Sequence, residues 1–374
     1  MKPSAPVLPL AGVRILSLAE QYPGPYATLL LADLGADVIL VERPAGGDPA
    51  RRFPGLFASF NRNKRSVALD LKSDQGREDF LRLVDSADVV MEGFRPGVMA
   101  RLKIGAEQLR ARKPELIFVS ISSVGQDGPQ AGVAAHDLSA QASAGMIDVP
   151  QGQEADLSLP MLPLADIGSA MFAAMGVVTA LYARTRSGRG ASVDISMLDV
   201  LVSWMTPFLV PPVNGLPTRI LPPQDPGYGL FATADQRQIT LSIAGEDSMW
   251  SALCKLLGLD DLAALREQER SDKARSITPR LRAAVARWNY GDLYKRLESL
   301  SIAFGPVHRL HEVLQDPQIV ARGMAVQVQG PGGTQTHLRQ PMLIDGSGGA
   351  VTCQAPELGQ HNAELLGERS ALLA

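Results

Sequence analysis

The sequence has few of the residues and motifs that identify several classes of protein. Only two of its 374 residues are cysteines, Cys254 and Cys353, and neither belongs to a CxxC or other metal-binding spacing. This count is typical of a protein from a reducing compartment, and we do not expect a disulfide between the two. The first predicted strand is not followed by GxGxxG, so the sequence carries no dinucleotide-binding motif.

A strong charge of one sign and long apolar runs are also absent. The formal net charge is −3, which does not indicate nucleic acid or an acidic membrane as a partner. No unbroken apolar run approaches the roughly 18 residues of a transmembrane helix. Residues 1–10 contain one lysine and three prolines instead of the apolar core of a signal peptide. We therefore expect a cytoplasmic enzyme without nucleic-acid or membrane partners.

The apolar residues predict an α/β fold. They make up 45% of the chain, which is enough for about two domains or one large discontinuous domain. A strand, a helix and a second strand follow one another near the start of the chain, and such a unit begins a parallel, doubly wound sheet. A Pro-rich stretch after Asp199 predicts a linker to a smaller α+β domain. The main predicted strands cover 13–18, 37–42, 88–92 and 117–122, and the helices cover 26–34, 74–87 and 170–184.

Cations gather near the predicted strand ends. Arg43 directly follows the second strand, at the edge where open α/β sheets bind their ligands. Arg62, Lys64, Arg65 and Lys72 occur within eleven positions of one another. This cluster predicts either a phosphate-binding patch or a solvated strand edge, and the residues alone leave both alternatives open.

The segment 125–191 holds the residues best suited to catalysis. His136 and Asp137 stand together in a loop setting, and Asp166 follows thirty positions after His136. Lone histidine and aspartate side chains beside glycines and small residues suit acid–base or nucleophilic chemistry. A helix that begins at Ile167 would make Asp166 its N-cap and direct backbone N–H groups toward a substrate oxygen. For His136, a structural role as the cap of the following helix is the alternative.

A series of different short motifs extends along nearly the whole chain. They are Pro23-Gly24-Pro25, Leu34–Val38, Glu42-Arg43-Pro44, Asn63–Lys72, Glu92–Gly97, Ser187–Gly190, Val193–Ser196, Gly305–Val307, Asp316-Pro317, Ala321–Met324 and Pro356–Gly359. Each motif is weak alone. Together, in this order, they resemble the family III CoA-transferase and α-methylacyl-CoA racemase family of CaiB/BaiF type.

This resemblance implies a fold, an assembly and a ligand. A large Rossmann-like domain with a parallel sheet (1–215) would be joined to a small α+β domain (216–324), and a C-terminal segment (325–374) would return to the large domain. Two identical subunits would interlock as a homodimer that binds acyl-CoA. The family uses no metal and no separate cofactor, because the CoA thioester is the substrate. Its CoA contacts correspond here to Arg43, Leu69, Lys72, Gly93, Phe94 and Arg101.

The same resemblance leaves two chemistries for Asp166, which matches the family's catalytic aspartate. A racemase would use Asp166 and His136 to remove and return the C2 proton of a 2-methylacyl-CoA through an enolate, with Glu246 supporting His136. A CoA-transferase would use Asp166 as a nucleophile and pass through an anhydride and an aspartyl-CoA thioester. His136 favours the racemase, which is our first hypothesis, whereas Gln141 and the run Pro163–Ile167 resemble a transferase. A CoA-binding subunit without catalytic activity is the third alternative.

Overall fold

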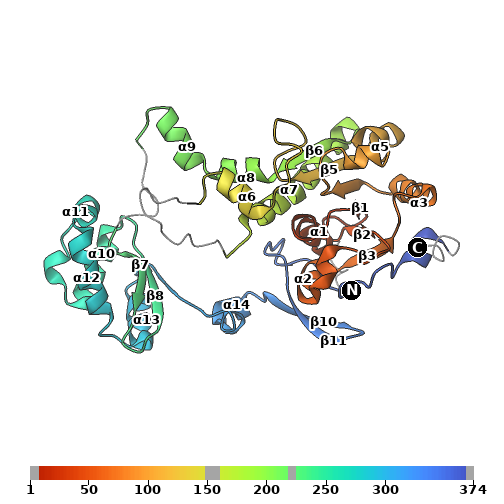
Figure 1. Ribbon diagram of the computed structural model, residues 1–374. Coiled ribbons are helices and arrows are strands. Elements are labelled where there is room, and N and C mark those ends of the chain that lie inside the picture. The colour runs from red at the N-terminus through yellow and green to blue at the C-terminus, as the bar shows by residue number, and fades with distance from the viewer. Residues whose placement is uncertain (1–7, 148–160, 218–224, 368–374) are drawn as a thin grey trace. The chain divides into compact units, whose positions relative to one another are not determined.

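The computed structural model of the protein describes residues 8–147, 161–217 and 225–367. The chain forms two compact units (Figure 1), of which unit 1 comprises Met1–Val210 and Arg322–Ala374 and unit 2 comprises Pro211–Ala321. These divisions lie a few residues before the boundaries at 215/216 and 324/325 that were placed from the sequence. The chain therefore leaves unit 1 after Val210 and re-enters it at Arg322.

Unit 1 is built on a six-stranded parallel sheet in the order β3-β2-β1-β4-β5-β6. Most of these strands are buried and rich in Val and Ile, as suits a sheet that is covered on both faces. Leu16 in β1 pairs with Ile39 in β2 and with Val90 in β4, which sets the parallel register. This sheet confirms the predicted Rossmann-like α/β fold, whereas the interlocked dimer stays a prediction. The strands are β1 (Arg14–Ser17), β2 (Asp37–Glu42), β3 (Lys64–Ala68), β4 (Val89–Glu92), β5 (Ile117–Ser122) and β6 (Ser192–Ser196).

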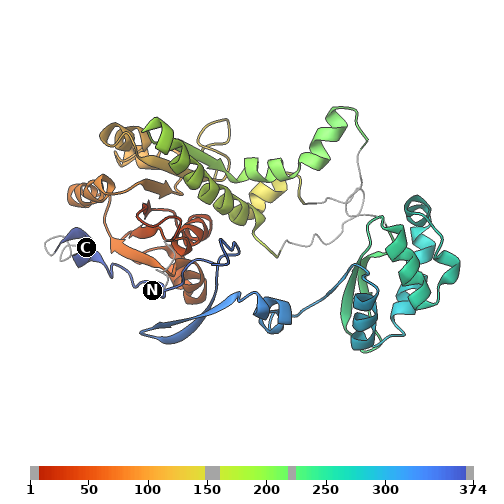
Figure 2. The ribbon, with the colours of Figure 1, turned by 180° about the vertical axis from the view of Figure 1, so that it is seen from behind.

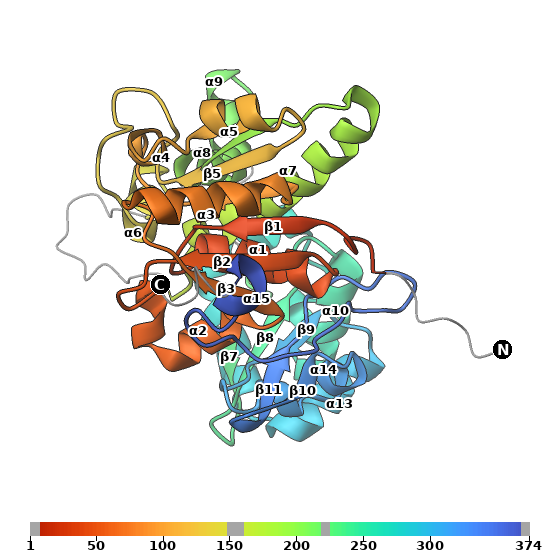
Figure 3. The ribbon, with the colours of Figure 1, turned by 90° about the vertical axis from the view of Figure 1, so that its right-hand side faces the viewer.

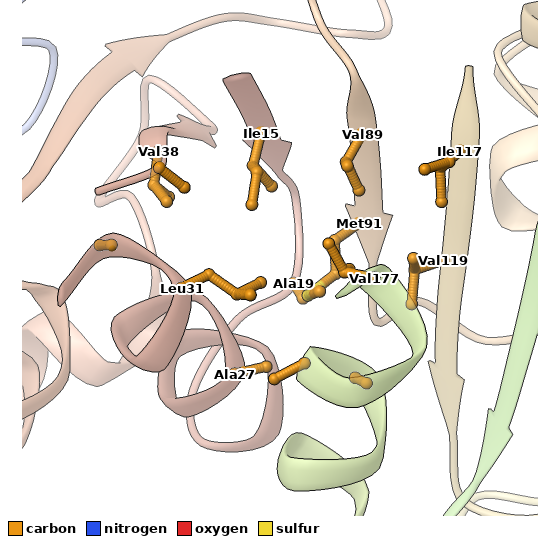
Figure 4. Close-up of a cluster of buried hydrophobic side chains, with 14 of the residues drawn as sticks. Ile15, Ala19, Ala27, Leu31, Val38, Val89, Met91, Ile117, Val119 and Val177 are labelled. Atoms are coloured by element: carbon orange, nitrogen blue, oxygen red, sulfur yellow. The ribbon is translucent and has the colours of Figure 1, made fainter. Parts of the chain in front are cut away.

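Hydrophobic clusters pack on both faces of this sheet, because successive side chains of a strand point to opposite sides. On one face the strands pack against α1 (Pro23–Asp33) and α7 (Leu164–Ser187), and Figure 4 shows Ile15, Met91 and Val177 in this cluster. The helices that contribute to the other cluster are α3 (Asp74–Asp85), α4 (Val98–Arg101), α5 (Ala106–Arg112) and α15 (Asn362–Leu366).

Helices also occupy part of the stretch that was predicted to be a linker. The boundary between the two units, after Val210, falls in this stretch as predicted, but residues 197–213 form two consecutive helices instead of an irregular linker. Apolar residues continue the second of these helices to its end, and Pro211 and Pro212 occupy its last turn. Residues 218–224 of the same stretch lie outside the described part of the chain. These two helices are α8 (Met197–Trp204) and α9 (Thr206–Val213). The remaining described helices of unit 1 are η1 (Pro49–Arg52), α2 (Pro54–Asn61) and α6 (Asp137–Ser143).

Helix α7 is unusually apolar for its length. Among the described residues it is the one helix that is long and apolar enough to cross a membrane, judged by length and composition only. Polar residues such as Ser169 and Thr179 interrupt its apolar runs, so the helix contains no unbroken apolar run of about 18 residues. Its inner face belongs to the core of unit 1, where Ala170, Ala173 and Val177 are buried. This packing accounts for the apolar character of that face.

The C-terminal part of the chain returns to unit 1, as the views in Figures 2 and 3 show. The N–H of Ser66 donates to His361 Nδ1 at 3.1 Å, and the N–H of Ala68 donates to Asn362 Oδ1 at 2.9 Å. Both donors belong to β3, the edge strand of the parallel sheet. The returning segment therefore covers an edge that would otherwise expose unpaired backbone groups. It includes the antiparallel hairpin of β10 (Ala325–Gly330) and β11 (Gly333–Leu338).

Unit 2 is a smaller α+β body with an antiparallel sheet in the order β7-β8-β9. Trp250 and Leu281 lie in a core that joins this sheet to the surrounding helices, and Trp250 Nε1 donates to the carbonyl of Leu262 at 2.8 Å. Buried Arg270 pairs with Asp225 at 2.8 Å. The elements are β7 (Tyr228–Ala232), β8 (Gln238–Ser242), α10 (Asp247–Leu257), η2 (Asp260–Leu262), α11 (Glu267–Asp272), α12 (Ala274–Val285), α13 (Tyr290–Ser299), β9 (Phe304–Pro306), η3 (Val313–Gln315) and α14 (Pro317–Ala321).

Candidate active site

A cavity of about 310 Å³ lies at the carboxyl edge of the parallel sheet, and all of its lining residues belong to unit 1. The loops that follow β1, β4 and β5 border it, together with the starts of α6 and α7. Strands β1 and β4 are neighbours whose chain connections lead to opposite sides of the sheet, and α/β sheets bind ligands at such a switch point. The cavity brings together Asp166, His136, Gly93 and Phe94. Its other polar lining residues are Glu20, Gln21, Tyr22, Arg95, Ser122, Ser123 and Asp137.

Asp166 is the third residue of α7. The side chain of Asp137, in α6, caps the N-terminus of this helix. The N-cap position is Pro163, so the prediction that the helix begins at Ile167 is wrong. The cause is Asp137, whose Oδ1 accepts the N–H groups of Ala165 at 2.7 Å and Asp166 at 3.2 Å. The N–H of Ile167 donates to the carbonyl of Pro163 at 3.0 Å. These N–H groups are occupied within the fold, so they do not serve the substrate oxygen as predicted.

The surroundings of Asp166 favour its neutral form. Burial, followed by the negative charge of Asp137, raises the pKa of the Asp166 carboxyl to about 7. The pKa of the Tyr22 phenol is also raised, first by burial and then by the charge of Asp166. Asp166 therefore titrates near neutral pH, which suits a carboxyl group that acts as a nucleophile or as a base.

His136 directly precedes α6 and lines the same cavity as Asp166. It occupies the N-cap position of α6, but its side chain makes no capping hydrogen bond. The residue is exposed. The alternative that the His136 side chain caps α6 is therefore wrong. The exposed imidazole is accessible to a molecule in the cavity.

Gly93 and Phe94 follow β4 and line the cavity beside Ala19. A Cβ atom at position 93 would lie 3.3 Å from the Ala19 Cβ, so glycine suits the close approach of the loops after β1 and β4. The N–H of Phe94 donates to Glu92 Oε2 at 2.7 Å. Glu92 is only 4% exposed. Burial raises the pKa of Glu92 to about 7, although hydrogen bonds from Ser120 and from the Phe94 N–H oppose this shift.

The other four predicted CoA contacts lie outside the cavity lining, after the carboxyl ends of strands. Arg43 follows β2, Leu69 and Lys72 follow β3, and Arg101 ends the short helix after β4. The three cations are exposed, whereas Leu69 is buried. Arg43 Nε donates to the carbonyl of Gly47 at 2.9 Å. Because β2 adjoins β1 and β3 adjoins β2 in the sheet, a ligand that extends from the cavity along this edge would pass the ends of both strands. The assignment of these residues to CoA stays a prediction.

Three of the four clustered cations serve the fold instead of a ligand. Arg62 is buried and pairs with buried Asp33 at 2.6 Å. Lys64 is buried and donates to backbone and amide oxygens, and Arg65 pairs with carboxylates of the same unit. The phosphate-patch alternative is wrong for these three, because they lie at the amino end of β3. Lys72 lies beyond its carboxyl end.

Gln21 is a cavity residue that the sequence analysis did not single out. Its φ is +66°, a left-handed conformation that is uncommon for residues other than glycine. Both carboxylate oxygens of Asp48 accept the Gln21 N–H at 3.1 Å, and the Asp48 N–H donates to Glu42 Oε2 at 2.9 Å. A strained backbone held by buried partners is typical of a functional site. Polar Glu20 and Gln21, which follow the apolar run that ends at Ala19, are the sequence signal that could have found it.

Glu20 and Arg95 also line the cavity without having been assigned a role. Burial, followed by the charge of Asp48, raises the pKa of Glu20 to about 7, while Arg43 opposes this shift. Arg95 follows Phe94 and is exposed, so it adds a positive charge to a lining that includes several carboxyl groups. Arg95 belongs to the motif Glu92–Gly97, and this motif is the sequence signal that could have identified it as a cavity residue.

Glu246 belongs to unit 2, where it is the N-cap residue of α10. Its carboxylate accepts the N–H of Ala244 at 2.7 Å. Its assignment as the supporting residue of His136 stays a prediction. Within the described parts of the chain, no group of three or more His, Cys, Asp or Glu residues could hold a metal ion.

Comparison with known proteins gives a match over most of the chain. Residues 10–362 match the family model described as CoA-transferase family III. The chain is 35% identical to a succinyl-CoA:mesaconate CoA-transferase of Haloarcula marismortui, over 96% of each protein. It is 32% identical to a succinate–glutarate CoA-transferase of Agrobacterium fabrum, over 96% of this chain and 95% of the relative. The crystal structure of a CAIB/BAIF family protein from Brucella suis matches with a TM-score of 0.84 and 29% identity, over 96% of this chain and 99% of that one.

Proposed function

Because the chain belongs to CoA-transferase family III, we propose that it transfers CoA from an acyl-CoA to a second carboxylic acid, with Asp166 as the nucleophile. The observation that carries this proposal is the position of Asp166, which lines the cavity at the switch point of the sheet and has a pKa of about 7. The names of the two relatives, both CoA-transferases, support it. The racemase hypothesis becomes the second candidate, because the relatives favour transfer.

The proposed reaction begins when a carboxylate oxygen of Asp166 attacks the carbonyl carbon of the thioester. The C–S bond breaks, CoA leaves as a thiolate, and an acyl-aspartyl anhydride forms. The thiolate then attacks the side-chain carbonyl carbon of Asp166, which releases the donor carboxylate and leaves an aspartyl-CoA thioester. The acceptor carboxylate then attacks the aspartyl-CoA thioester, which releases the CoA thiolate and forms a second anhydride. The thiolate attacks the acceptor's carbonyl carbon in this anhydride, which gives the acceptor's CoA ester and frees the Asp166 carboxylate. Asp166 returns unchanged, and the reaction consumes no water.

This role makes the first half-reaction depend on pH. Only the ionised carboxylate attacks the thioester, and the pKa of Asp166 is about 7. The rate of the first half-reaction is therefore expected to increase as the pH rises through about 7, and to fall on the acidic side as the carboxyl becomes protonated.

A transfer assay tests the proposal. The protein is incubated with succinyl-CoA and a panel of acceptors that includes glutarate and mesaconate, which appear in the names of the relatives. The CoA ester of at least one acceptor is expected to form, and Asp166→Asn is expected to lower the rate on the order of 10⁴-fold or more, since it removes the nucleophile. Asp127→Asn, in the exposed loop before α6, is the matched control and should keep the wild-type rate. If no acceptor gains CoA, the proposal is contradicted for these acids.

Epimerisation at C2 is the second candidate, and the exposed His136 in the same cavity favours it. If His136 and Asp166 exchange a C2 proton, a 2-methylacyl-CoA will gain deuterium at C2 in deuterated water. His136→Ala should then lower this exchange by about 10²- to 10⁴-fold, the usual contribution of a general base. Under the transfer proposal, the same variant keeps CoA transfer within about 10-fold of the wild type. A wild-type protein that exchanges no deuterium contradicts this second candidate.

A further inference from the structure

A partly buried hydrogen-bond network connects α6 with the start of α7, and the proposed mechanism does not use it. Asp137 Oδ1 accepts the N–H groups of Ala165 at 2.7 Å and Asp166 at 3.2 Å. Asp137 Oδ2 accepts Gln141 Nε2 at 2.6 Å. Gln141 is 2% exposed, and its Nε2 also lies 3.4 Å from the carbonyl oxygen of Leu162. One turn of α6 therefore contacts both Leu162, two residues before α7, and the first turn of α7.

We propose that Asp137, held in place by Gln141, is a positioning residue that fixes the first turn of α7 and so directs the Asp166 carboxyl group toward the thioester. This inference rests on the proposed function of Asp166. A carboxylate at a helix N-terminus accepts N–H groups that have no partner within the helix, and it interacts favourably with the helix dipole. Because one of these N–H groups belongs to Asp166 itself, the cap fixes the backbone from which the Asp166 side chain extends.

The cap also acts on Asp166 through its charge. The negative charge of Asp137 adds to the effect of burial on the pKa of Asp166. The other titratable groups that line the cavity are Glu20 and Tyr22, before α1, Arg95, after β4, and His136, just before α6. A substitution that removes the charge but keeps an oxygen acceptor therefore separates the electrostatic effect from the positioning effect.

Two substitutions at position 137 make this separation. Asp137→Ala removes both the acceptor and the charge, and it is expected to slow aspartyl-CoA formation from succinyl-CoA by about 100-fold with little change in KM, because the nucleophile is misplaced. Asp137→Asn keeps the acceptor for α7, and the Gln141 amide can turn its oxygen toward the new amide. This variant is expected to stay within about 10-fold of the wild type, with the midpoint of its pH–rate profile moved to lower pH.

Position 141 tests whether the two residues act as one unit. Gln141→Ala is expected to slow the same step by about 10-fold, because Asp137 loses its support. The double variant with Asp137→Ala is expected to be no slower than Asp137→Ala alone, since Gln141 acts through Asp137. Asp127→Asn, an exposed acid outside the network, is the matched control. Additive losses at the two positions would contradict the inference for Gln141.

Amide hydrogen exchange provides a measurement that does not depend on activity. The N–H groups of Ala165 and Asp166 are expected to exchange about 2- to 30-fold faster in Asp137→Ala, as for the loss of an N-cap, and at nearly the wild-type rate in Asp137→Asn. If the wild type transfers no CoA, the proposed function fails and the exchange result decides whether the cap exists. If the wild type is active and both variants keep its rate, pH midpoint and amide protection, the inference is overturned. An equal loss of rate in both variants with both amides still protected would also overturn it.

Discussion

The carboxyl edge of the parallel sheet and the amino end of β3 both contain charged side chains, but the two regions use them differently. At the carboxyl edge, Asp166 and Arg95 face a cavity. At the amino end of β3, Arg62 pairs with Asp33 at 2.6 Å, and both residues are buried. Charged residues in the first region are therefore accessible to a ligand, whereas those in the second hold parts of the chain together.

Strand polarity explains this difference. All strands of a parallel sheet end at the same edge, where loops begin and the next helices present their N-termini. Residues at the opposite ends of the strands are far from that edge, and their side chains meet the neighbouring strands and the returning C-terminal segment. The length of β3 separates Arg62, which precedes this strand, from Lys72, which follows it, although both belong to one cluster in the sequence.

The largest effect is expected from breaking the amino-end region at Arg62. Arg62→Met leaves the carboxylate of Asp33 buried without its cation and removes the bond from Arg62 to the carbonyl of Leu338 at 2.7 Å. The free energy of unfolding is expected to fall by about 3–5 kcal/mol, measured by urea denaturation. The affinity of the folded protein for acyl-CoA should not change, since Arg62 lies away from the carboxyl edge.

An exposed ion pair provides the control for this experiment. Arg77 pairs with exposed Asp74 on α3, and Arg77→Met should cost less than about 1 kcal/mol. If Arg62→Met instead left stability intact and weakened acyl-CoA binding, Arg62 would belong to the ligand-binding region and the comparison would fail.

The second effect is a pH dependence of stability from Glu92. Its pKa is raised from 4.5 to about 7, so the folded protein keeps a proton that the unfolded chain releases in this range. The stability that neutral Glu92 contributes is therefore full below about 4.5 and is lost as the pH rises to about 7. Glu92→Gln retains an uncharged acceptor for the Phe94 N–H and removes this loss.

Urea denaturation at about pH 5 and about pH 8 measures the effect. Between these values, the wild type is expected to lose about 2 kcal/mol of unfolding free energy relative to Glu92→Gln. Equal pH dependence in the two proteins would show that Glu92 is ionised in the folded state throughout, and that the carboxyl edge does not hold it neutral.

The smallest effect is expected at Lys72, the member of the cluster that lies beyond the carboxyl end of β3. Lys72→Ala removes one exposed charge that could contact a phosphate, so acyl-CoA binding is expected to weaken by about 10-fold, measured by calorimetry. The free energy of unfolding should be unchanged. Arg112, which pairs with Asp85 at 2.6 Å at the end of α5, is the control, and Arg112→Ala should leave binding unchanged. Equal effects of the two substitutions on binding would contradict a role of Lys72 at this edge.

The sequence predicts the sheet well because apolar runs and their spacing determine parallel strands and covering helices. The strands 37–42 and 117–122 coincide with β2 and β5, and the elements around them differ by a few residues at their ends. The start of α7 was predicted less well, because a side chain from another helix determines it. Asp137 extends α7 to Leu164 through hydrogen bonds that local propensity does not describe.

The candidate site was predicted in part, for a similar reason. Asp166 and His136 stand out in the sequence as lone catalytic residue types, and the structure brings them to one cavity. Arg62 stands out equally as a cation, but only its contact with Asp33, 29 positions away, shows that it has a structural role. Gln21 was missed because its left-handed conformation depends on the carboxylate of Asp48, which a one-dimensional pattern does not relate to it.

The most direct test of the central claim is peptide mapping of the protein after incubation with succinyl-CoA in the absence of an acceptor acid. The proposed mechanism predicts CoA bound as a thioester to the side chain of Asp166, which hydroxylamine converts to a hydroxamate and which Asp166→Asn does not form. A protein that transfers CoA at full rate while Asp166 stays unmodified throughout would contradict the claim that this carboxylate is the nucleophile.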